Sequence, residues 1–326
     1  MSLLVKHIKA RVAASGLTPQ SGGRNIIAFS GGVDSSLVAA VVNKVYPSNS
    51  TACIGRSAAL PQAQLEMARH IASSIGIEIK EIDTDEGTNE QYVANEGKSC
   101  FHCKTHLYTA LEAVAETATS ADIYVTMAMT SMSLSALNDL VPALTHPMFN
   151  IVAGPSSSRV MLFNGTNRDD RADTSRVGLK AAHNFGVASP IDHLTKDEVR
   201  AAAKELGLPN WNHAASPCLR SRLAFGVRAT PQRLHEVEQA ELIVKEELQL
   251  HAEHNLRVRS MAGNKALVEV DAAVVAAAMA SIETLKARII PLGFQALSVR
   301  QFRSGALSGH ATAAMVQQHE ASVADQ

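Results

Sequence analysis

The chain of 326 residues has little cysteine, almost no net charge and no long apolar run. Four cysteines are too few for a disulfide framework and are typical of a reducing compartment, where thiols serve metal or redox chemistry. A formal net charge of −1 creates no overall field that would attract nucleic acid or a membrane surface. No stretch of about 18 apolar residues occurs, so no transmembrane helix is predicted. We therefore expect a cytoplasmic protein without a membrane or nucleic-acid partner.

The first part of the chain lacks acidic residues altogether. The first acid is Asp34, and it is preceded by four basic residues, Lys6, Lys9, Arg11 and Arg24. Such a basic, acid-free segment can be a transit peptide. The apolar spacing also fits a helix over residues 2–15 that covers the rest of the protein through Leu3, Leu4, Ile8 and Val12. Of these two interpretations we favour the helix.

Residues 30–36 read Ser-Gly-Gly-Val-Asp-Ser-Ser and stand between two apolar runs, 26–29 and 37–42. This layout predicts a buried strand, a tight turn and the start of a helix, whose unpaired N–H groups can hold an anion. Glycine lets the backbone approach a phosphate closely. The segment has no Walker lysine and resembles instead the PP-loop of ATP pyrophosphatases, which cleave ATP between its α- and β-phosphates. An ordinary strand–helix turn is the alternative.

The order of apolar segments predicts an α/β fold with a doubly wound parallel sheet. Strands are expected at 25–29, 51–54, 77–82 and 160–163, with helices at 35–45, 62–75, 105–117, 173–184 and 195–206 between and after them. Ligands of such sheets bind at the carboxyl ends of the strands, where residues 30–36 and 54–57 fall.

From about residue 228 the pattern changes to a small α+β unit. It is expected to contain helices at 232–249 and 272–288 and strands at 255–260, 266–270 and 295–299. We therefore predict a PP-loop ATP pyrophosphatase domain over residues 1–225 and a substrate-binding or oligomerisation domain over residues 226–326. Residues 118–158, which are poor in charge, are predicted to be an insertion.

Three of the four cysteines lie in segments that suit chemistry. Cys100 and Cys103 form a C-x-x-C pair just before a predicted helix, whose N-terminus favours thiolates. Cys218 lies in an irregular loop beside Arg220 and Arg222, which suits a reactive or ligating thiolate. Cys53 lies in an apolar strand and is predicted to belong to the core.

Several sites remain compatible with these thiols. Three thiolates without a fourth can hold an iron–sulfur cube with one open iron, because full ligation needs four cysteines. His102 and His213 lie near by in the sequence and could complete a zinc site instead. For both histidines we favour simple exposure in loops.

Arginines of the C-terminal part form a second candidate site. Arg257 and Arg259 alternate in a predicted strand and therefore share one face, and Arg300 and Arg303 follow the last strand. Guanidinium groups suit phosphate or carboxylate recognition, so an anionic substrate is one interpretation and a solvated strand face is the other.

Together these motifs resemble the LarE family, ATP-dependent sulfur transferases that make the nickel-pincer cofactor. The resemblance covers roughly residues 20–115 and 160–309, and its motifs occur in the same order at 29–36, 100–104, 165–170, 207–211, 218–222, 257–259 and 303–305. It implies that ATP adenylylates a carboxylate of pyridinium-3,5-biscarboxylic acid mononucleotide and that sulfur then displaces AMP to give a thiocarboxylate.

The resemblance also implies a source of sulfur. One type of the family sacrifices the cysteine that aligns with Cys218, and the other holds a [4Fe–4S] cluster with three cysteines. Because Cys100, Cys103 and Cys218 are all present, the cluster type is predicted, with these three as catalytic residues and as the cluster ligands. A separate sulfur donor, a sulfide or a cysteine desulfurase system, and a homo-oligomer are expected.

The remaining site residues follow from the same resemblance. ATP, with Mg²⁺ on Asp34, is expected at Ser30, Gly31, Gly32, Asp34, Ser35, Ser36 and Asp170. The substrate is expected at Arg222, Arg257, Arg259 and Arg303.

The chain departs from the family pattern in three places. Residues 118–158 have no counterpart, Arg168 replaces a small residue and Arg220 replaces an alanine. The alternatives are a tRNA-thiolating PP-loop enzyme, an amide-forming enzyme such as an NAD synthetase, and a non-catalytic nucleotide- or metal-binding protein. A net charge of −1 gives the first little support, and the second leaves the three cysteines unexplained.

Overall fold

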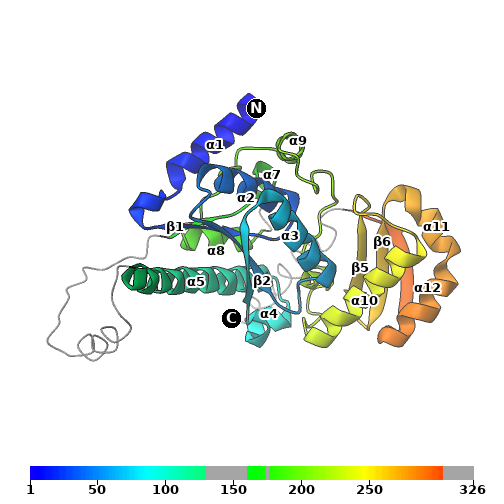
Figure 1. Cartoon of the computed structure of the whole chain (residues 1–326). Coiled ribbons are helices and arrows are strands. Elements are labelled where there is room, and N and C mark those ends of the chain that lie inside the picture. Colours follow the sequence, from blue (N-terminus) through cyan, green and yellow to red (C-terminus); the bar gives the residue numbers. More distant parts are fainter. Residues whose placement is uncertain (130–159, 174–175, 304–326) are drawn as a thin grey trace, which may run out of the picture.

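The structure, a computed structural model, describes residues 1–129, 160–173 and 176–303. A larger N-terminal unit surrounds a parallel sheet, and a smaller unit with its own sheet lies beside it (Figure 1). The sheet of the larger unit has the order β3-β2-β1-β4, and all its neighbours are parallel. Its strands are β1 (Arg24–Ala28), β2 (Ser50–Arg56), β3 (Glu78–Asp83) and β4 (Val160–Phe163). The predicted PP-loop type of α/β fold is confirmed.

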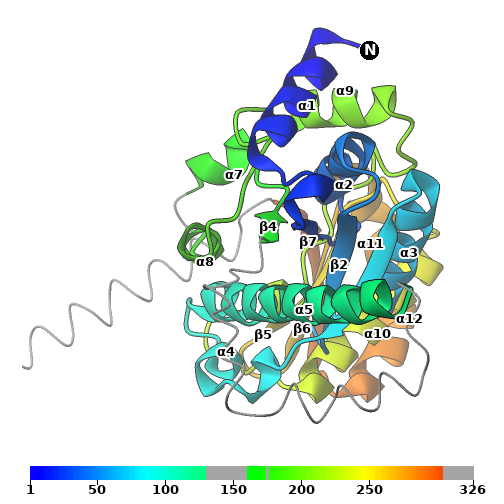
Figure 2. The same ribbon diagram turned by 60° about the vertical axis from the view of Figure 1, so that its left-hand side comes forward.

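Helices cover both faces of this sheet, as Figure 2 shows. One face packs against α1 (Leu3–Ser15), α2 (Val33–Val45), α3 (Gln62–Ile75) and α9 (Lys196–Glu205) around the largest apolar core. The other face packs against α5 (Ser99–Met129) and α8 (Gly178–Asn184), and α5 contributes the buried Tyr108 and Leu111 to this core. This is the doubly wound arrangement, which turns the carboxyl ends of the strands toward one edge.

The predicted N-terminal helix is present as α1. Val5, Ile8 and Val12 form its buried face. The expectation that Leu3 belongs to this face is wrong, because Leu3 is 83% exposed. At a spacing of three to four residues from Ile8, Val5 takes that place.

Two helix predictions also differ from the structure. Only the second half of the expected helix at 173–184 is helical, as α8, and a separate short helix, α7 (Arg168–Ala172), which Asn167 caps, precedes it. The helix expected to end near residue 117 continues as α5 to Met129, so residues 118–129 of the predicted insertion are helical. The remainder of that insertion, residues 130–158, lies outside the described residues.

The smaller unit is the predicted α+β unit. It contains α10 (Pro231–Glu247), α11 (Val275–Ala280) and α12 (Ile282–Ile289), packed on β5 (Leu256–Met261), β6 (Lys265–Val270) and β7 (Ala296–Gln301). Strands β5 and β6 are antiparallel, and β6 and β7 are parallel. The helix expected over 272–288 is instead a 3₁₀ turn, η4 (Ala272–Val274), followed by α11 and α12, which meet at Ser281.

The two units share an apolar core. Ala59, Tyr92 and Val93 of the larger unit and Leu219 and Leu223 of the connecting segment belong to the core of the smaller unit. The predicted domain boundary between residues 225 and 226 therefore falls inside a packed connection, and it stays a prediction. Among the described residues, no helix combines the length and the hydrophobicity needed to cross a membrane.

Candidate active site

The PP-loop joins β1 to α2 at the carboxyl edge of the larger sheet. Gly31 has a φ of +71°, and a Cβ there would lie 3.0 Å from Ala68 of α3. Only glycine fits this left-handed, closely packed position. No side chain caps the start of α2, where Gly32 is the exposed N-cap. The first N–H groups of α2 are therefore free of a side-chain cap, as an anion-binding helix start requires.

Hydroxyl and amide groups give the loop its shape. Ser35 Oγ donates to Gly32 O at 3.0 Å and accepts from the Ser30 amide at 3.2 Å. Ser36 is fully buried, and Asn210 Nδ2 donates to its Oγ at 3.0 Å and to Gly31 O at 2.8 Å. Among the predicted ATP-binding hydroxyls, Ser30 is exposed, whereas Ser35 and Ser36 lie in the interior and support the loop.

A lysine that the sequence analysis missed lies against the acid of the loop. Lys196, the first residue of α9, contacts Asp34 Oδ2 through its Nζ, and Asn167 Nδ2 donates to Asp34 Oδ1 at 3.0 Å. The sequence predicts a helix at 195–206, but the partner of Lys196 stands 162 residues earlier in the chain. Lys196 thus places a cation beside the PP-loop, which has no lysine of its own.

The segment after β4 lies directly against the PP-loop. A Cβ at Gly165 would lie 2.6 Å from Ser35 N, so the two backbones touch. Asp170, predicted to bind ATP, completes a capping box with Asn167 and forms an ion pair with Arg176 at 2.8 Å. Burial raises the pKa of Asp170. Its carboxylate is thus engaged in the loop, and its contact with ATP stays a prediction.

The three predicted site cysteines come from two elements at the junction of the units. Cys100 and Cys103 lie at the start of α5, and Cys218 precedes the 3₁₀ turn η3 (Leu219–Arg222). Arg220 connects the two elements, because its Nη2 donates to Cys100 Sγ at 2.8 Å and its Nη1 to Asn95 Oδ1 at 2.6 Å. The arginine that departs from the family pattern is therefore part of the cysteine site.

Burial shifts the pKa of Cys103, the second thiol of the C-x-x-C pair. It raises the pKa of Cys103 to about 12, and the neighbouring Cys218 adds to the shift. The expectation that the helix N-terminus favours a thiolate is wrong for Cys103, because desolvation outweighs the helix dipole. Cys100 accepts its hydrogen bond from the guanidinium group of Arg220.

The PP-loop and the Cys218 loop, defined as residues 215–221, share one edge of the sheet. Leu219 N donates to Ala59 O at 2.8 Å, and Gln64 Nε2 donates to Ser30 O at 2.9 Å. Ala59 and Gln64 both belong to the segment that follows β2. The connection from Asn210 to Cys218 likewise begins at the PP-loop and ends at the cysteines. The nucleotide half and the thiol half of the predicted site are therefore neighbours.

The donor set at the junction consists of three thiols. The three thiols are the ligand type that an iron–sulfur cluster takes, and Cys100 and Cys218 both influence the pKa of Cys103. Within the described ranges, however, no three His, Cys, Asp or Glu side chains are close enough together to hold a metal ion. The donor chemistry fits a cluster, and ligation would require the three sulfurs to move toward one another.

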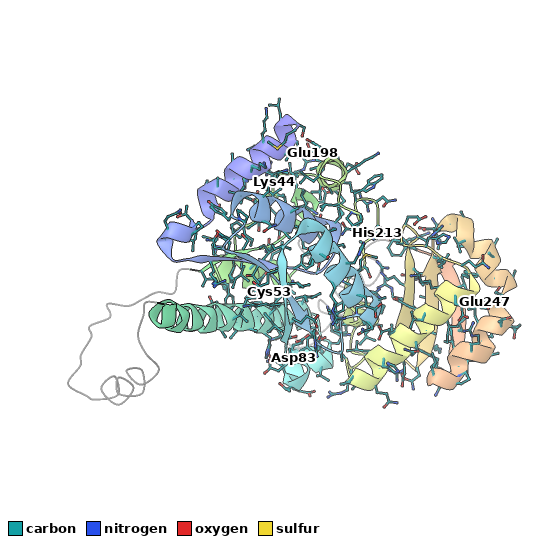
Figure 3. The ribbon with its side chains drawn as sticks, viewed as in Figure 1. Lys44, Cys53, Asp83, Glu198, His213 and Glu247 are labelled. Atoms are coloured by element: carbon teal, nitrogen blue, oxygen red, sulfur yellow. The ribbon has the colours of Figure 1, made fainter. Side chains whose placement is uncertain are left out.

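The other thiol and the two histidines lie elsewhere. Cys53 is fully buried in β2, which confirms its assignment to the core, and burial raises its pKa to about 12 (Figure 3). His102 lies in α5 and His213 in the segment that links the units, and both are half-buried. Burial lowers the pKa of each. The expectation of simple exposure in loops is therefore wrong for both histidines.

Three of the four predicted substrate arginines are buried and already paired. Arg222, Arg257 and Arg259 are between 1% and 6% exposed, so a solvated strand face is excluded. Burial, with Arg222 close by, lowers the pKa of Arg257 to about 10. Arg303 is exposed and has no hydrogen bond or ion pair within the described part of the chain. A substrate role stays a prediction for all four residues.

Comparison with known proteins agrees with this geometry. The family model described as NAD synthase matches residues 2–103, which include the PP-loop. An uncharacterized protein of Synechocystis, slr1717, is 32% identical over 72% of this chain and 74% of its own length. A pyridinium-3,5-bisthiocarboxylic acid mononucleotide synthase of Lactiplantibacillus plantarum is 28% identical over 67% of this chain and 66% of its own length. A glutamine-hydrolyzing GMP synthase of Streptomyces avermitilis is 24% identical over 69% of this chain, but the match covers 40% of that enzyme.

Proposed function

The chain belongs to the LarE family of PP-loop proteins, and from this premise we propose that it is an ATP-dependent sulfur transferase. Its substrate would be pyridinium-3,5-biscarboxylic acid mononucleotide, and its product the corresponding thiocarboxylate in nickel-pincer cofactor synthesis. The observation that carries the proposal is the shared edge of the PP-loop and the Cys218 loop, tied together through Ala59, Gln64 and Asn210. A nucleotide-activating loop beside three thiols suits sulfur transfer better than amide formation.

The PP-loop would carry out the first half of the reaction. A substrate carboxylate oxygen attacks the α-phosphorus of ATP, the bond to the bridging oxygen breaks, and pyrophosphate leaves. The N–H groups at the start of α2 and the ammonium group of Lys196 would stabilise the negative charge that builds up on pyrophosphate. Asp34 would hold Mg²⁺ while Asn167 orients its carboxylate.

The cysteine site would carry out the second half. A sulfur nucleophile attacks the acyl carbon of the adenylate, the carbon–oxygen bond to AMP breaks, and AMP leaves with that oxygen. Arg303, exposed after β7, would bind the phosphate or the second carboxylate of the substrate. The connection that begins at Asn210, beside the PP-loop, ends at Cys218. We therefore assign Cys218 as the thiol closest to the adenylate.

Cys100, Cys103 and Cys218 would hold the [4Fe–4S] cluster predicted from the sequence. When bound, such a cluster supplies an iron without a protein ligand, at which an additional sulfide can be carried. The protein's own contribution is to deliver two thiols from α5 and one from the Cys218 loop. We also propose a cytoplasmic location, a separate sulfur donor and a homo-oligomer.

Anaerobic turnover tests this function. Purified protein is incubated with ATP, Mg²⁺, sulfide and the biscarboxylic acid mononucleotide, and products are identified by mass spectrometry. We expect AMP, pyrophosphate and a substrate in which sulfur has replaced one oxygen. Cys218→Ala should abolish the sulfur product, and Cys53→Ala, the matched control in the core, should retain it. ADP as the nucleotide product, or product formation by Cys218→Ala, would exclude the proposal.

Metal analysis of the same anaerobic protein tests the sulfur source. Iron and acid-labile sulfide that are lost on changing any one of the three site cysteines are expected. Iron-free protein that carries dehydroalanine at position 218 after turnover would indicate the sacrificial type instead. Stoichiometric zinc would contradict both.

A further inference from the structure

Three buried guanidinium groups bind backbone carbonyl groups of the Cys218 loop. Arg222 Nη1 donates to Cys218 O at 3.1 Å and contacts Pro217 O. Arg259 Nη1 donates to Ser221 O at 2.8 Å, and Arg257 Nη2 contacts Ala215 O. Four carbonyl groups of one short loop are thus bonded to arginines of the same cluster.

We propose that Arg222, Arg257 and Arg259 are positioning residues that fix the place of the Cys218 thiol. The inference rests on the proposed function, in which this thiol must meet an adenylate formed at the PP-loop. It gives these arginines a different role from the substrate binding predicted from the sequence.

Two glutamates, of which Glu241 is half-buried, bind the arginines in turn. Glu241 of α10 accepts from Arg222 Nε at 2.9 Å and from Nη2 at 3.1 Å, and it also accepts from Val258 N at 3.0 Å. Glu269 of β6, fully buried, accepts from Arg259 Nε at 2.8 Å and from Arg300 Nε at 2.9 Å. The chain of contacts runs from the helix and strands of the smaller unit to the loop. The smaller unit therefore sets the position of a thiol that lies at the junction.

The chemistry of arginine explains why the cluster uses this side chain. A guanidinium group has five N–H donors in a fixed plane, so Arg222 can bind a carboxylate on one edge and two carbonyl groups on another. A lysine at the same place keeps the charge but has no such planar fork. Each of the three arginines already binds at least one carbonyl group of the Cys218 loop.

Alkylation of the cysteines tests the proposal without ATP or substrate. The full-length, reduced, metal-free protein is treated with iodoacetamide, and modification of each cysteine is followed by mass spectrometry. In Arg222→Lys we expect Cys218 to react about tenfold faster, the factor that loss of a charge-assisted hydrogen bond gives. Cys53, in the core, should react as slowly as in the parent protein. Glu241→Gln weakens the hydrogen bonds between residue 241 and Arg222, and it should likewise make Cys218 react faster.

The matched control is Arg288→Lys. Arg288 forms an ion pair with Glu246 at 2.5 Å on the surface of the smaller unit, and its replacement should leave Cys218 unchanged. In turnover, Arg222→Lys should slow sulfur incorporation while ATP–pyrophosphate exchange with substrate stays within about twofold of the parent.

Two results would overturn the proposal. An unchanged Cys218 rate together with a raised KM for the substrate would make Arg222 a substrate ligand. A parallel increase in the Cys53 rate would mean that Arg222 supports the fold as a whole. Since alkylation needs no turnover, it remains decisive even where the proposed sulfur transfer is absent.

Discussion

The PP-loop is held by neutral groups, whereas the Cys218 loop is held by buried charges. Around the PP-loop, the hydroxyl group of Ser35 and the amide of Asn210 bind the backbone, and the hydroxyl group of Ser36 accepts from the same amide. Around the Cys218 loop, Arg222 and Arg259 bind the backbone and are balanced by Glu241 and Glu269. Both loops are irregular, and both lie at the same edge of the sheet.

This difference separates two tasks. In the proposed reaction, neutral support would leave the charge of ATP to be met by the N–H groups of α2 and by Lys196, which pairs with Asp34 and is partly exposed. Buried ion pairs cost desolvation energy and are rarely the best route to stability. Their presence beside the Cys218 loop indicates that holding this loop in place outweighs the stability that is lost by burying the charges. The experiments below test whether the two halves can be separated.

The largest effect is expected from Cys218→Ala. Removal of the thiol should lower sulfur incorporation by at least about 10³-fold, because a ligand of the proposed sulfide-carrying cluster is lost. ATP–pyrophosphate exchange in the presence of substrate should continue at nearly the parental rate, since the PP-loop is untouched. Equal loss of both activities would show that the halves do not act separately.

The complementary change is Lys196→Met. Exchange of pyrophosphate into ATP should fall by about 10²- to 10³-fold, because a cation beside the leaving group is removed. The alkylation rate of Cys218 should stay the same. Lys204→Met, on the same helix but stacked on Trp211, serves as the control. A variant of Lys196 with full exchange activity would remove this lysine from the nucleotide half.

A moderate effect is expected where the backbones touch. In Gly165→Ala the new Cβ would lie 2.6 Å from Ser35 N and 2.7 Å from Asp34 C, so the PP-loop must shift. We expect the free energy of unfolding to fall by about 1–3 kcal/mol, as in other overpacked sites, and the KM for ATP to rise. Gly87→Ala, where a Cβ meets no atom within 4 Å, should change neither quantity. Urea denaturation and exchange kinetics measure the two effects.

The smallest effect concerns Cys53, the thiol in the core of the larger unit. Burial raises the pKa of Cys53 from 9.0 to about 12. The folded state therefore binds this proton more tightly than the unfolded state. The contribution of Cys53 to the free energy of unfolding is complete below about pH 9 and declines between about pH 9 and pH 12.

Urea denaturation at about pH 8 and about pH 10 measures this decline. Cys53→Ala should show a weaker decline than the parent protein, by roughly 1 kcal/mol per pH unit. Identical slopes in both proteins would contradict the assigned burial of this thiol.

Much of the fold could be predicted because its signals are local. Apolar runs and the glycines after β1 predicted the order of strands and helices, including the helix at 195–206 that is α9. Boundaries were less accurate where a side chain decides them, because Asn167 caps a separate short helix, α7, before the predicted helix at 173–184. No residue near position 117 ends a helix, so the full length of α5 was not predicted.

The site was predictable in its residue types and less so in their contacts. Lys196 meets Asp34, and Arg220 meets Cys100, across 162 and 120 residues, and no pattern in the sequence connects such pairs. Strand alternation placed Arg257 and Arg259 on one face, but their burial depends on Glu241 and Glu269. Likewise, the position of Cys103 at a helix start did not reveal the desolvation that raises its pKa.

The central claim is that the substrate carboxylate is adenylylated before sulfur enters, and a heavy-oxygen label tests it most directly. Substrate labelled in both carboxylates is turned over with unlabelled ATP and sulfide, and AMP is analysed by mass spectrometry. Attack of the carboxylate on the α-phosphorus followed by displacement at carbon moves one labelled oxygen into AMP. We expect one label in AMP for each sulfur incorporated. Unlabelled AMP, or ADP in its place, would contradict the account.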